Sequence, residues 1–542
     1  MLNTKNSGII LSQNTSVPFG THKNTNTLIV APAESGKKLR FILPNLLMAD
    51  RNYVVNDPSG DLFQMLSGYF KERGYHVMRF ALNDPTHSHV YNPFDYLKNI
   101  HGTYDEAKID EFVDIILNSM YEQKTIGRGD MFWQQASKAL LKACVWMILE
   151  CYPEPMHNMS QLARLIEKGR IKDGGEETTD LENLFDKMRA SSQSYKCLEY
   201  FDTFRLSPTK TMNSILISLS VDLYEYHIPD IQDITTTAYN VKTRNLRNEI
   251  RMFRKDENGD YIRTEENVDF KNLLKEKTII FTSGNIKSAT HQAMITMFYV
   301  HMFNTLCEYQ SKATRYTQII LDEAGNWRVD NLSYALNSLT QNTSVSLLVQ
   351  SISNLKHTYE KDWENITALC PNKVFFGTIN NEQDKEYIYA LCGESDSTST
   401  DIECLMIDTT INMAKFGEVL VFTDDNHIIT DKCFHEKQTE LLLTSINKKP
   451  DAEKTVEIHT TSKALSAATT ENIENKIVRK QEDSKIDISI LLQEAFLRGK
   501  VAGENDMCSR IAALLQDGRT EDALEFCRNE ALRAIKIIAK NE

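Results

Sequence analysis

The stretch Thr27-Leu-Ile-Val-Ala-Pro-Ala-Glu-Ser-Gly-Lys-Lys38 decides the fold class. Its first four residues form a short apolar run typical of a buried strand, and a helical pattern begins at Lys37 after a loop over residues 31–36. Residues 53–57 and 75–80 are two further strand candidates, with a helix expected over Asp61–Glu72 between them. Strands and helices that alternate through short links predict a parallel α/β sheet.

The pattern changes between residue 101 and residue 240. Apolar residues there recur three and four positions apart, and strand-like runs are nearly absent, which predicts a helical insertion into the α/β domain. Strands then return, and the last of them, with 426–429, predicts an antiparallel hairpin at the edge of the sheet. The returning strand candidates are 278–281, 318–321, 345–349, 373–376 and 418–422.

These patterns divide the chain into five segments. The α/β domain is expected in two parts, residues 1–100 and 241–444, on either side of an inserted all-α domain at 101–240. Residues 445–484 are polar with little periodicity, which is typical of a linker. Amphipathic stretches after them predict a helical tail at 485–542.

Composition excludes several classes of protein. With 41% hydrophobic and 25% charged residues among 542, the chain is globular rather than disordered. A net charge of −14 argues against a broadly basic surface for nucleic acid. The ten scattered cysteines lack a C-x-x-C pair and predict reduced thiols in a cytosolic protein. No apolar run reaches the ~18 residues of a membrane span, so we expect none.

The loop after the first strand is close to the phosphate-binding P-loop, G-x-x-x-x-G-K-[ST]. Ser35, Gly36, Lys37 and Lys38 are therefore the candidate nucleotide-binding residues, because backbone N–H groups and the Lys37 charge favour an anion there. Two positions depart from the pattern. Ala31 replaces the first glycine, and Lys38 replaces the hydroxyl that normally binds Mg²⁺, although a protonated lysine has no lone pair to donate.

A second signal stands at the end of the strand candidate 318–321, which is followed by Asp322 and Glu323. In nucleotide hydrolysis an aspartate in this place orients Mg²⁺, and a glutamate polarises the attacking water. Gln350 closes the next strand candidate, where its side chain can reach a γ-phosphate. Ordinary strands also end at acidic residues, so the hypothesis depends on these features occurring together. We take Glu323 and Gln350 as candidate catalytic residues and Asp322 as the candidate Mg²⁺ residue.

Four arginines form the best nucleic-acid candidate in the chain. Arg244, Arg247, Arg251 and Arg254 sit three or four apart and predict a basic face on a helix. A solvated face paired with nearby acidic residues is the simpler interpretation, and DNA binding is the alternative.

Short motifs spread over residues 9–430 resemble those of the type IV secretion coupling proteins, the TraG/TraD-like conjugation ATPases. One of them, Val54-Val-Asn-Asp57-Pro58-Ser-Gly60-Asp61, is similar to the family's D-P-K-G-E. The others include Phe41-Ile-Leu-Pro44-Asn45-Leu46, Tyr91-Asn92-Pro93-Phe94, Leu321-Asp322-Glu323 and Leu348-Val-Gln350-Ser351.

The resemblance implies a RecA-like P-loop NTPase domain with an inserted all-α domain, assembled as a hexamer. It implies ATP and Mg²⁺ as cofactors, and a role in handing a relaxase–DNA complex or other secreted cargo to the membrane proteins of a secretion channel. Contact with single- or double-stranded DNA is implied as well. Family members usually carry two N-terminal membrane helices that this sequence lacks, so we expect a cytoplasmic protein held at the inner face of the cell membrane by a partner.

Two functional hypotheses follow, and they differ on ATP hydrolysis. In the first, the chain is a coupling protein that binds ATP and hydrolyses it weakly. In the alternative, it is a catalytically inactive adaptor that docks cargo for a separate ATPase. The altered P-loop favours feeble hydrolysis, as does the lack of Lys or Arg between Asn331 and Ser353, where the family carries candidate arginine fingers. The sequence leaves the enzymatic activity open.

Overall fold

The computed structural model describes residues 8–19, 24–121, 130–170, 178–191, 194–239, 241–243, 251–253, 256, 261–285, 287–339, 342–376, 381–392, 418–424 and 428–432. All of them belong to one compact unit, Met1–Lys448. The linker and the helical tail expected after residue 444 lie outside the described residues.

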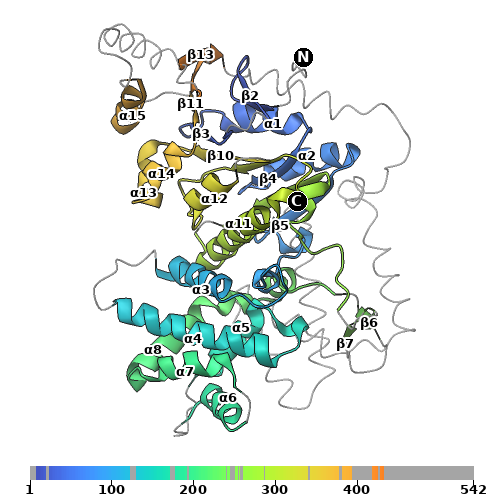
Figure 1. Cartoon of the computed structure of the whole chain (residues 1–542), viewed down its shortest axis with the longest axis vertical. Coiled ribbons are helices and arrows are strands. Elements are labelled where there is room, and N and C mark those ends of the chain that lie inside the picture. Colours follow the sequence, from blue (N-terminus) through green and yellow to red (C-terminus); the bar gives the residue numbers. More distant parts are fainter. Residues whose placement is uncertain are drawn as a thin grey trace, which may run out of the picture. The chain divides into compact units, whose positions relative to one another are not determined.

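Nine described strands form one sheet in the order β13-β12-β11-β3-β10-β9-β4-β8-β5 (Figure 1). The seven strands from β11 to β5 are parallel, and β12 and β13 add an antiparallel hairpin at one edge. The mostly parallel α/β sheet predicted from the sequence is therefore confirmed. The strands are β3 (Thr27–Val30), β4 (Asn52–Asn56), β5 (His76–Ala81), β8 (Thr278–Ser283), β9 (Thr317–Leu321), β10 (Thr343–Val349), β11 (Asn372–Phe376), β12 (Glu418–Phe422) and β13 (Ile428–Lys432).

Helices cover both faces of this sheet because successive strand residues point to opposite sides. Along β3, Leu28 and Val30 join one apolar core, and Ile29 joins the other. The Ile29 side is covered by α1 (Leu43–Leu47), α2 (Asp61–Glu72) and a small hairpin of β1 (Gly8–Ile10) and β2 (Ser16–Pro18). The opposite side is covered by α11 (Ala289–Tyr309), α12 (Leu332–Ser338), α13 (Ile352–Tyr359) and α14 (Trp363–Ala368). Two further helices, α10 (Asn272–Lys275) and α15 (Glu382–Cys392), complete the sheet region.

Seven described α-helices lie between β5 and residue 240 in the chain. They pack on one another and, through α3, on α11, which runs between them and the sheet (Figure 1). Their apolar faces continue the α11 core, which explains the three-and-four spacing in the sequence. These helices fall within the range 101–240 that was expected to be helical, while the domain boundaries themselves stay predictions. They are α3 (Glu106–Tyr121), α4 (Asp130–Cys151), α5 (Met159–Glu167), α6 (Asp180–Arg189), α7 (Lys196–Arg205), α8 (Thr209–Asp222) and α9 (Pro229–Ile234).

The basic helical face predicted after this segment is wrong at Arg251. This residue lies in β7 (Arg251–Phe253), which pairs antiparallel with β6 (Val241–Thr243). Val, Thr and Phe residues in the two strands favour a pleated conformation, and the pairing outweighs the helical spacing of the arginines. The other three, Arg244, Arg247 and Arg254, lie outside the described residues, and the role of all four in nucleic-acid binding stays a prediction.

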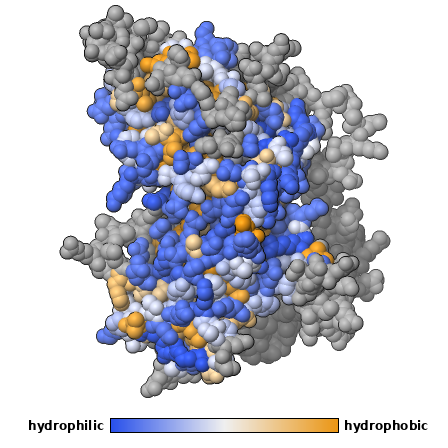
Figure 2. All heavy atoms as spheres, viewed as in Figure 1, coloured by the Kyte–Doolittle hydropathy of each residue, from blue (hydrophilic) through white to orange (hydrophobic). Residues whose placement is uncertain are grey.

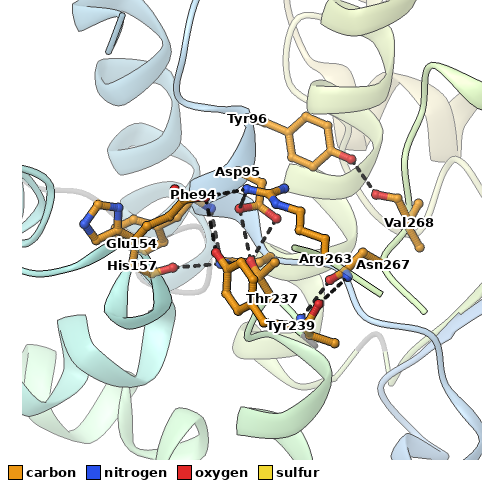
Figure 3. Close-up of polar contacts among 12 residues, drawn as sticks. Phe94, Asp95, Tyr96, Glu154, His157, Thr237, Tyr239, Arg263, Asn267 and Val268 are labelled. Atoms are coloured by element: carbon orange, nitrogen blue, oxygen red, sulfur yellow. Dashed lines mark hydrogen bonds and ion pairs between the residues drawn. The ribbon is translucent and has the colours of Figure 1, made fainter. Parts of the chain in front are cut away.

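Polar side chains join the two places where the chain crosses between the sheet and the helices (Figure 3). Asp95, in the short helix η3 (Pro93–Tyr96), accepts a 2.9 Å hydrogen bond from Thr237 Oγ1, which itself accepts one from Asn92 Nδ2 at 2.8 Å. Arg263 Nη2 lies 3.0 Å from a carboxylate oxygen of Asp95 and 3.0 Å from one of Glu154. We call these five residues the junction cluster.

The surface is largely polar. Hydrophilic residues cover much of the face shown in Figure 2, and hydrophobic ones are scattered among them. Across the residue ranges given above, no helix combines the length and the apolar character needed to cross a membrane.

Candidate functional site

Three neighbouring strands bring the predicted nucleotide-binding residues to one edge of the sheet. β10 lies between β3 and β9, with Val349 beside Val30 and Leu347 beside Leu321. Because the three strands are parallel, their carboxyl ends meet at the same edge. The P-loop after β3, Gln350 after β10 and the Asp322-Glu323 pair after β9 are therefore adjacent, as the sequence predicted.

The P-loop turns at Glu34 and Gly36 rather than at Ala31. Glu34 has a φ of +61° and Gly36 a φ of +79°. Both values lie in the left-handed region, which glycine adopts more readily than other residues. Ala31 instead donates its N–H to the carbonyl of Val349 at 2.9 Å and continues the sheet pairing. The replacement of the first glycine by alanine therefore does not strain this loop.

Beyond the loop, Lys37 contacts the acidic pair at the end of β9. Its Nζ lies 2.6 Å from Asp322 Oδ1 and 3.8 Å from Glu323 Oε1. Asp322 is 2% exposed, and this burial raises the pKa of its carboxyl while the nearby Lys37 ammonium opposes the rise. Lys37 thus neutralises a buried carboxylate and is held at the same time where an incoming anion would meet it.

The acidic pair itself is held by its neighbours. The carbonyl of Asp322 accepts hydrogen bonds from Asn56 Nδ2 at 2.9 Å and from Trp327 Nε1 at 3.2 Å. Glu323 has a φ of +58°, and its N–H donates to Asp322 Oδ1 at 2.9 Å. Its side chain is 33% exposed, so it remains accessible to water at the strand end. A carboxylate held in this way can accept a proton from water or bind a cation.

Lys38 makes contacts that the sequence did not reveal. Its Nζ donates to Ser59 Oγ at 2.8 Å and lies 3.2 Å from Asp61 Oδ2. Ser59 Oγ also donates to Asp61 Oδ2 at 2.7 Å, and these bonds, from Ser59 first and then Lys38, lower the pKa of Asp61. The ammonium next to the P-loop is therefore paired with the first residue of α2.

Asp57 is a further charged residue of the site that was not among the predicted site residues. It follows β4, is 1% exposed, and accepts a 3.0 Å bond from the N–H of Phe63 through Oδ2. Its Oδ1 is buried without a hydrogen-bond partner in the described structure. Burial raises the pKa of Asp57, and the bonds from the backbone of α2 and the charge of Lys38 oppose the rise. Its place at the end of a strand, in the D-P-S-G-D motif, was the available signal.

An open hollow of about 740 Å³ lies beside the loop. Its polar lining consists of Glu34, Gly36, Lys37, Lys38, Asp61 and Gln64. Apolar side chains of η1 (Lys38–Ile42), α1 and α2 complete the wall; they are Leu39, Leu43, Leu62 and Met65. The hydroxyl of Ser35 in the same loop is buried without a hydrogen-bond partner. The hollow therefore combines two ammonium groups, two carboxylates and an apolar wall, and small-molecule sites commonly join an apolar wall to a few polar groups in this way.

The donor set does not fit the Mg²⁺ that a P-loop normally uses. Mg²⁺ needs oxygen ligands in octahedral geometry, and the residue after the P-loop lysine normally supplies a hydroxyl. Lys38 supplies a positive charge there instead. Asp322 Oδ1 is already engaged by Lys37 at 2.6 Å.

Two protein-family models match this chain. The family model described as "Type IV secretory system Conjugative DNA transfer" matches residues 3–253. A second, described as "TraM recognition site of TraD and TraG", matches residues 317–403. The first range contains the P-loop, and the second starts at the first residue of β9, which leads to Asp322. The chain is thus similar to proteins of conjugative DNA transfer over ranges that include this site.

Individual relatives agree with these matches over short stretches. The conjugal transfer protein TraG of Escherichia coli is 27% identical over 118 residues, which are 21% of this chain and 18% of that protein. VirD4 of Agrobacterium fabrum is 32% identical over 80 residues, 14% of this chain and 12% of that protein. The chain thus aligns with less than a fifth of the length of these two curated relatives. With both models in chain order, the chain is similar to the TraG/TraD-like coupling proteins.

A solved structure shares the fold. The bacterial conjugative coupling protein TrwBdeltaN70, in its unbound monoclinic form, superposes with a TM-score of 0.52 over 79% of this chain and 88% of that chain. The sequence identity is 13%, so this likeness shows the α/β fold alone.

Proposed function

We propose that this protein is the coupling protein of a type IV secretion or conjugation system and recruits a relaxase–DNA complex or a protein cargo to the secretion channel. One observation carries the proposal: the two family matches, to conjugative DNA transfer and to TraM recognition, together include all three strand ends of the site. These matches favour a coupling role over the catalytically inactive adaptor.

The site at the ends of β3, β10 and β9 is the nucleotide-binding part of this function. Lys37 contacts the phosphates, and Glu323 and Gln350 act on the water and the γ-phosphate. The proximity of Lys37 to Asp322 and Glu323 supports this arrangement. The sheet then acts as a RecA-like motor domain with an inserted all-α domain, six copies of which form a ring.

Partners follow from the matched families. Residues 317–403 are the proposed recognition region for a TraM-like protein of the relaxase complex. Membrane proteins of the secretion channel hold the chain at the inner face of the cell membrane. The DNA is bound to the relaxase and is transferred with it. A mass measurement of the purified full chain by light scattering tests the ring, which predicts about six times 62.1 kDa.

The decisive experiment measures DNA transfer from donor cells. Deleting the gene for this chain is expected to abolish transfer of the cognate element, and the wild-type gene supplied in trans restores it. Lys210→Thr, which changes an exposed residue of α8 outside both the site and residues 317–403, is the control and restores transfer as well. Undiminished transfer after deletion would refute the proposed function.

A further inference from the structure

Position 38 holds a cation where a P-loop normally holds a metal ligand. The Lys38 ammonium is 34% exposed and pairs with Asp61, whose side chain is 61% exposed. Ion pairs this exposed contribute little to stability, so an incoming anion can replace Asp61 at small cost. The Lys38 ammonium is therefore available to pair with an anion that binds beside the phosphate loop.

The polar groups around Lys38 are incompletely satisfied. Ser35 Oγ in the loop and Asp57 Oδ1 just after β4 are both buried without a hydrogen-bond partner in the described structure, and Asp57 as a whole is 1% exposed. Buried polar groups are normally paired, so each of these two atoms has hydrogen-bonding capacity to spare. The hydroxyl can donate to a phosphate oxygen, and the carboxylate oxygen can accept from an ammonium.

We infer that this site binds the phosphates of a nucleotide without Mg²⁺, and that the Lys38 ammonium supplies the positive charge which the metal supplies in an ordinary P-loop. The inference rests on the nucleotide-binding part of the proposed function and specifies the form of the ligand. Lys37 and Lys38 would contact the phosphate oxygens from two sides, with Ser35 as a neutral donor between them. A divalent cation placed at position 38 would face this ammonium, which already engages the nearby oxygens Ser59 Oγ and Asp61 Oδ2.

The first test measures binding of a fluorescent ATP analogue to the full chain, in EDTA and in excess Mg²⁺. The expected dissociation constants agree within about threefold. Tighter binding in Mg²⁺ by more than about threefold would overturn the inference and leave the proposed nucleotide site intact. A lack of binding under both conditions would refute the inference and the proposed nucleotide site together.

Two substitutions at one position separate charge from metal binding. Lys38→Met removes the ammonium and is expected to weaken metal-free binding by about tenfold. Lys38→Thr restores a hydroxyl and is expected to make Mg²⁺ tighten binding by about tenfold. The control Lys361→Thr removes an exposed lysine beyond α13 and is expected to change neither value. Wild-type behaviour of both Lys38 variants would overturn the inference.

Asp61→Asn tests whether the Lys38 ammonium can pair with an incoming anion. It removes the competing carboxylate, so metal-free binding of the analogue is expected to tighten by about threefold. Competition by tripolyphosphate in EDTA then distinguishes binding through the phosphate chain from binding through the base. Displacement of the analogue by tripolyphosphate assigns the affinity to the phosphate chain, as inferred; failure to displace it, at concentrations where unlabelled ATP does, would assign it to the base and overturn the inference.

Discussion

The P-loop edge and the junction cluster both depend on buried carboxylates, yet they are built in opposite ways. At the junction, Asp95 receives a hydroxyl and a guanidinium that also contacts Glu154, so its charges are shared within one network (Figure 3). At the P-loop edge, Lys37 and Lys38 are divided between separate acidic partners.

This difference separates stability from binding. A satisfied network orders two crossings of the chain and has nothing further to bind. At the P-loop edge, Ser35 Oγ and Asp57 Oδ1 have no hydrogen-bond partner in the described structure, and an open hollow lies beside the loop. The Ser35 hydroxyl can donate to a phosphate oxygen, so a ligand rather than the protein can complete its hydrogen bonding. Changes at the junction should therefore alter unfolding, and changes at Lys38 should alter binding.

The largest expected effect comes from Arg263→Met. Removing the guanidinium leaves Asp95 and Glu154 near each other without their shared cation. Breaking a buried pair costs about 3–5 kcal/mol, and the 41% exposure of Arg263 reduces our expectation to about 2 kcal/mol. The measurement is the urea midpoint by circular dichroism. Lys385→Met, at an exposed pair with Glu382, is the control and should shift the free energy of unfolding by less than about 0.5 kcal/mol.

A pH effect of similar size is expected at Asp95. Burial raises the pKa of this carboxyl to about 6, partly opposed by Arg263. The folded protein then keeps a proton that the unfolded chain releases, so this contribution is full below about pH 4 and is lost as the pH rises through 6. Relative to Asp95→Asn, the wild-type free energy of unfolding should fall by about 2 kcal/mol between pH 4 and pH 7. A difference that is constant over this range would contradict the expectation.

A smaller effect is expected for Lys37→Met. Asp322, 2% exposed, would lose the ammonium 2.6 Å away, which should lower the free energy of unfolding by about 1–2 kcal/mol at pH 7. The double variant Lys37→Met, Asp322→Asn removes the uncompensated charge and should regain most of the loss. A double-mutant cycle by chemical denaturation measures this coupling, and strictly additive effects would show that the pair is not energetically linked.

The smallest effect on stability is expected for Lys38→Thr. Because Lys38 and Asp61 are 34% and 61% exposed, the free energy of unfolding should change by less than about 0.5 kcal/mol. Thermal unfolding of the wild type and the variant checks this. A loss above about 1 kcal/mol would place Lys38 with the junction cluster as a structural residue.

Much of the fold could be predicted because its signals are local. The apolar runs of β3 and β9 and the helix Asp61–Glu72 fall where the sequence placed them. The error at Arg251 has a non-local cause, since β7 exists only through its pairing with β6. Likewise, nothing local shows that Ala31 continues the sheet and that the turn falls at Glu34 and Gly36.

The residues of the candidate site also fall into those that local sequence predicts and those that only the folded chain reveals. Lys37, Asp322 and Glu323 were predicted from motifs whose chemistry is readable one segment at a time. Asp57 and the pairing of Lys38 were missed, because they depend on which strand lies beside which and on where a long side chain finds its counter-charge. The junction cluster was missed for the same reason, since Asp95 and Thr237 are 142 positions apart.

The sequence by itself determined the class of fold, the position of the phosphate loop and the unusual lysine that follows it, because hydrophobic period and loop chemistry are properties of short segments. Only the tertiary structure decided what that lysine does. The order of the strands sets β4 beside β9 and brings α2 next to the P-loop, so the Lys38 ammonium meets Asp61 while Lys37 alone neutralises Asp322. Charges interact through space rather than along the chain. For this reason, only the folded protein shows that two adjacent lysines pair with different carboxylates.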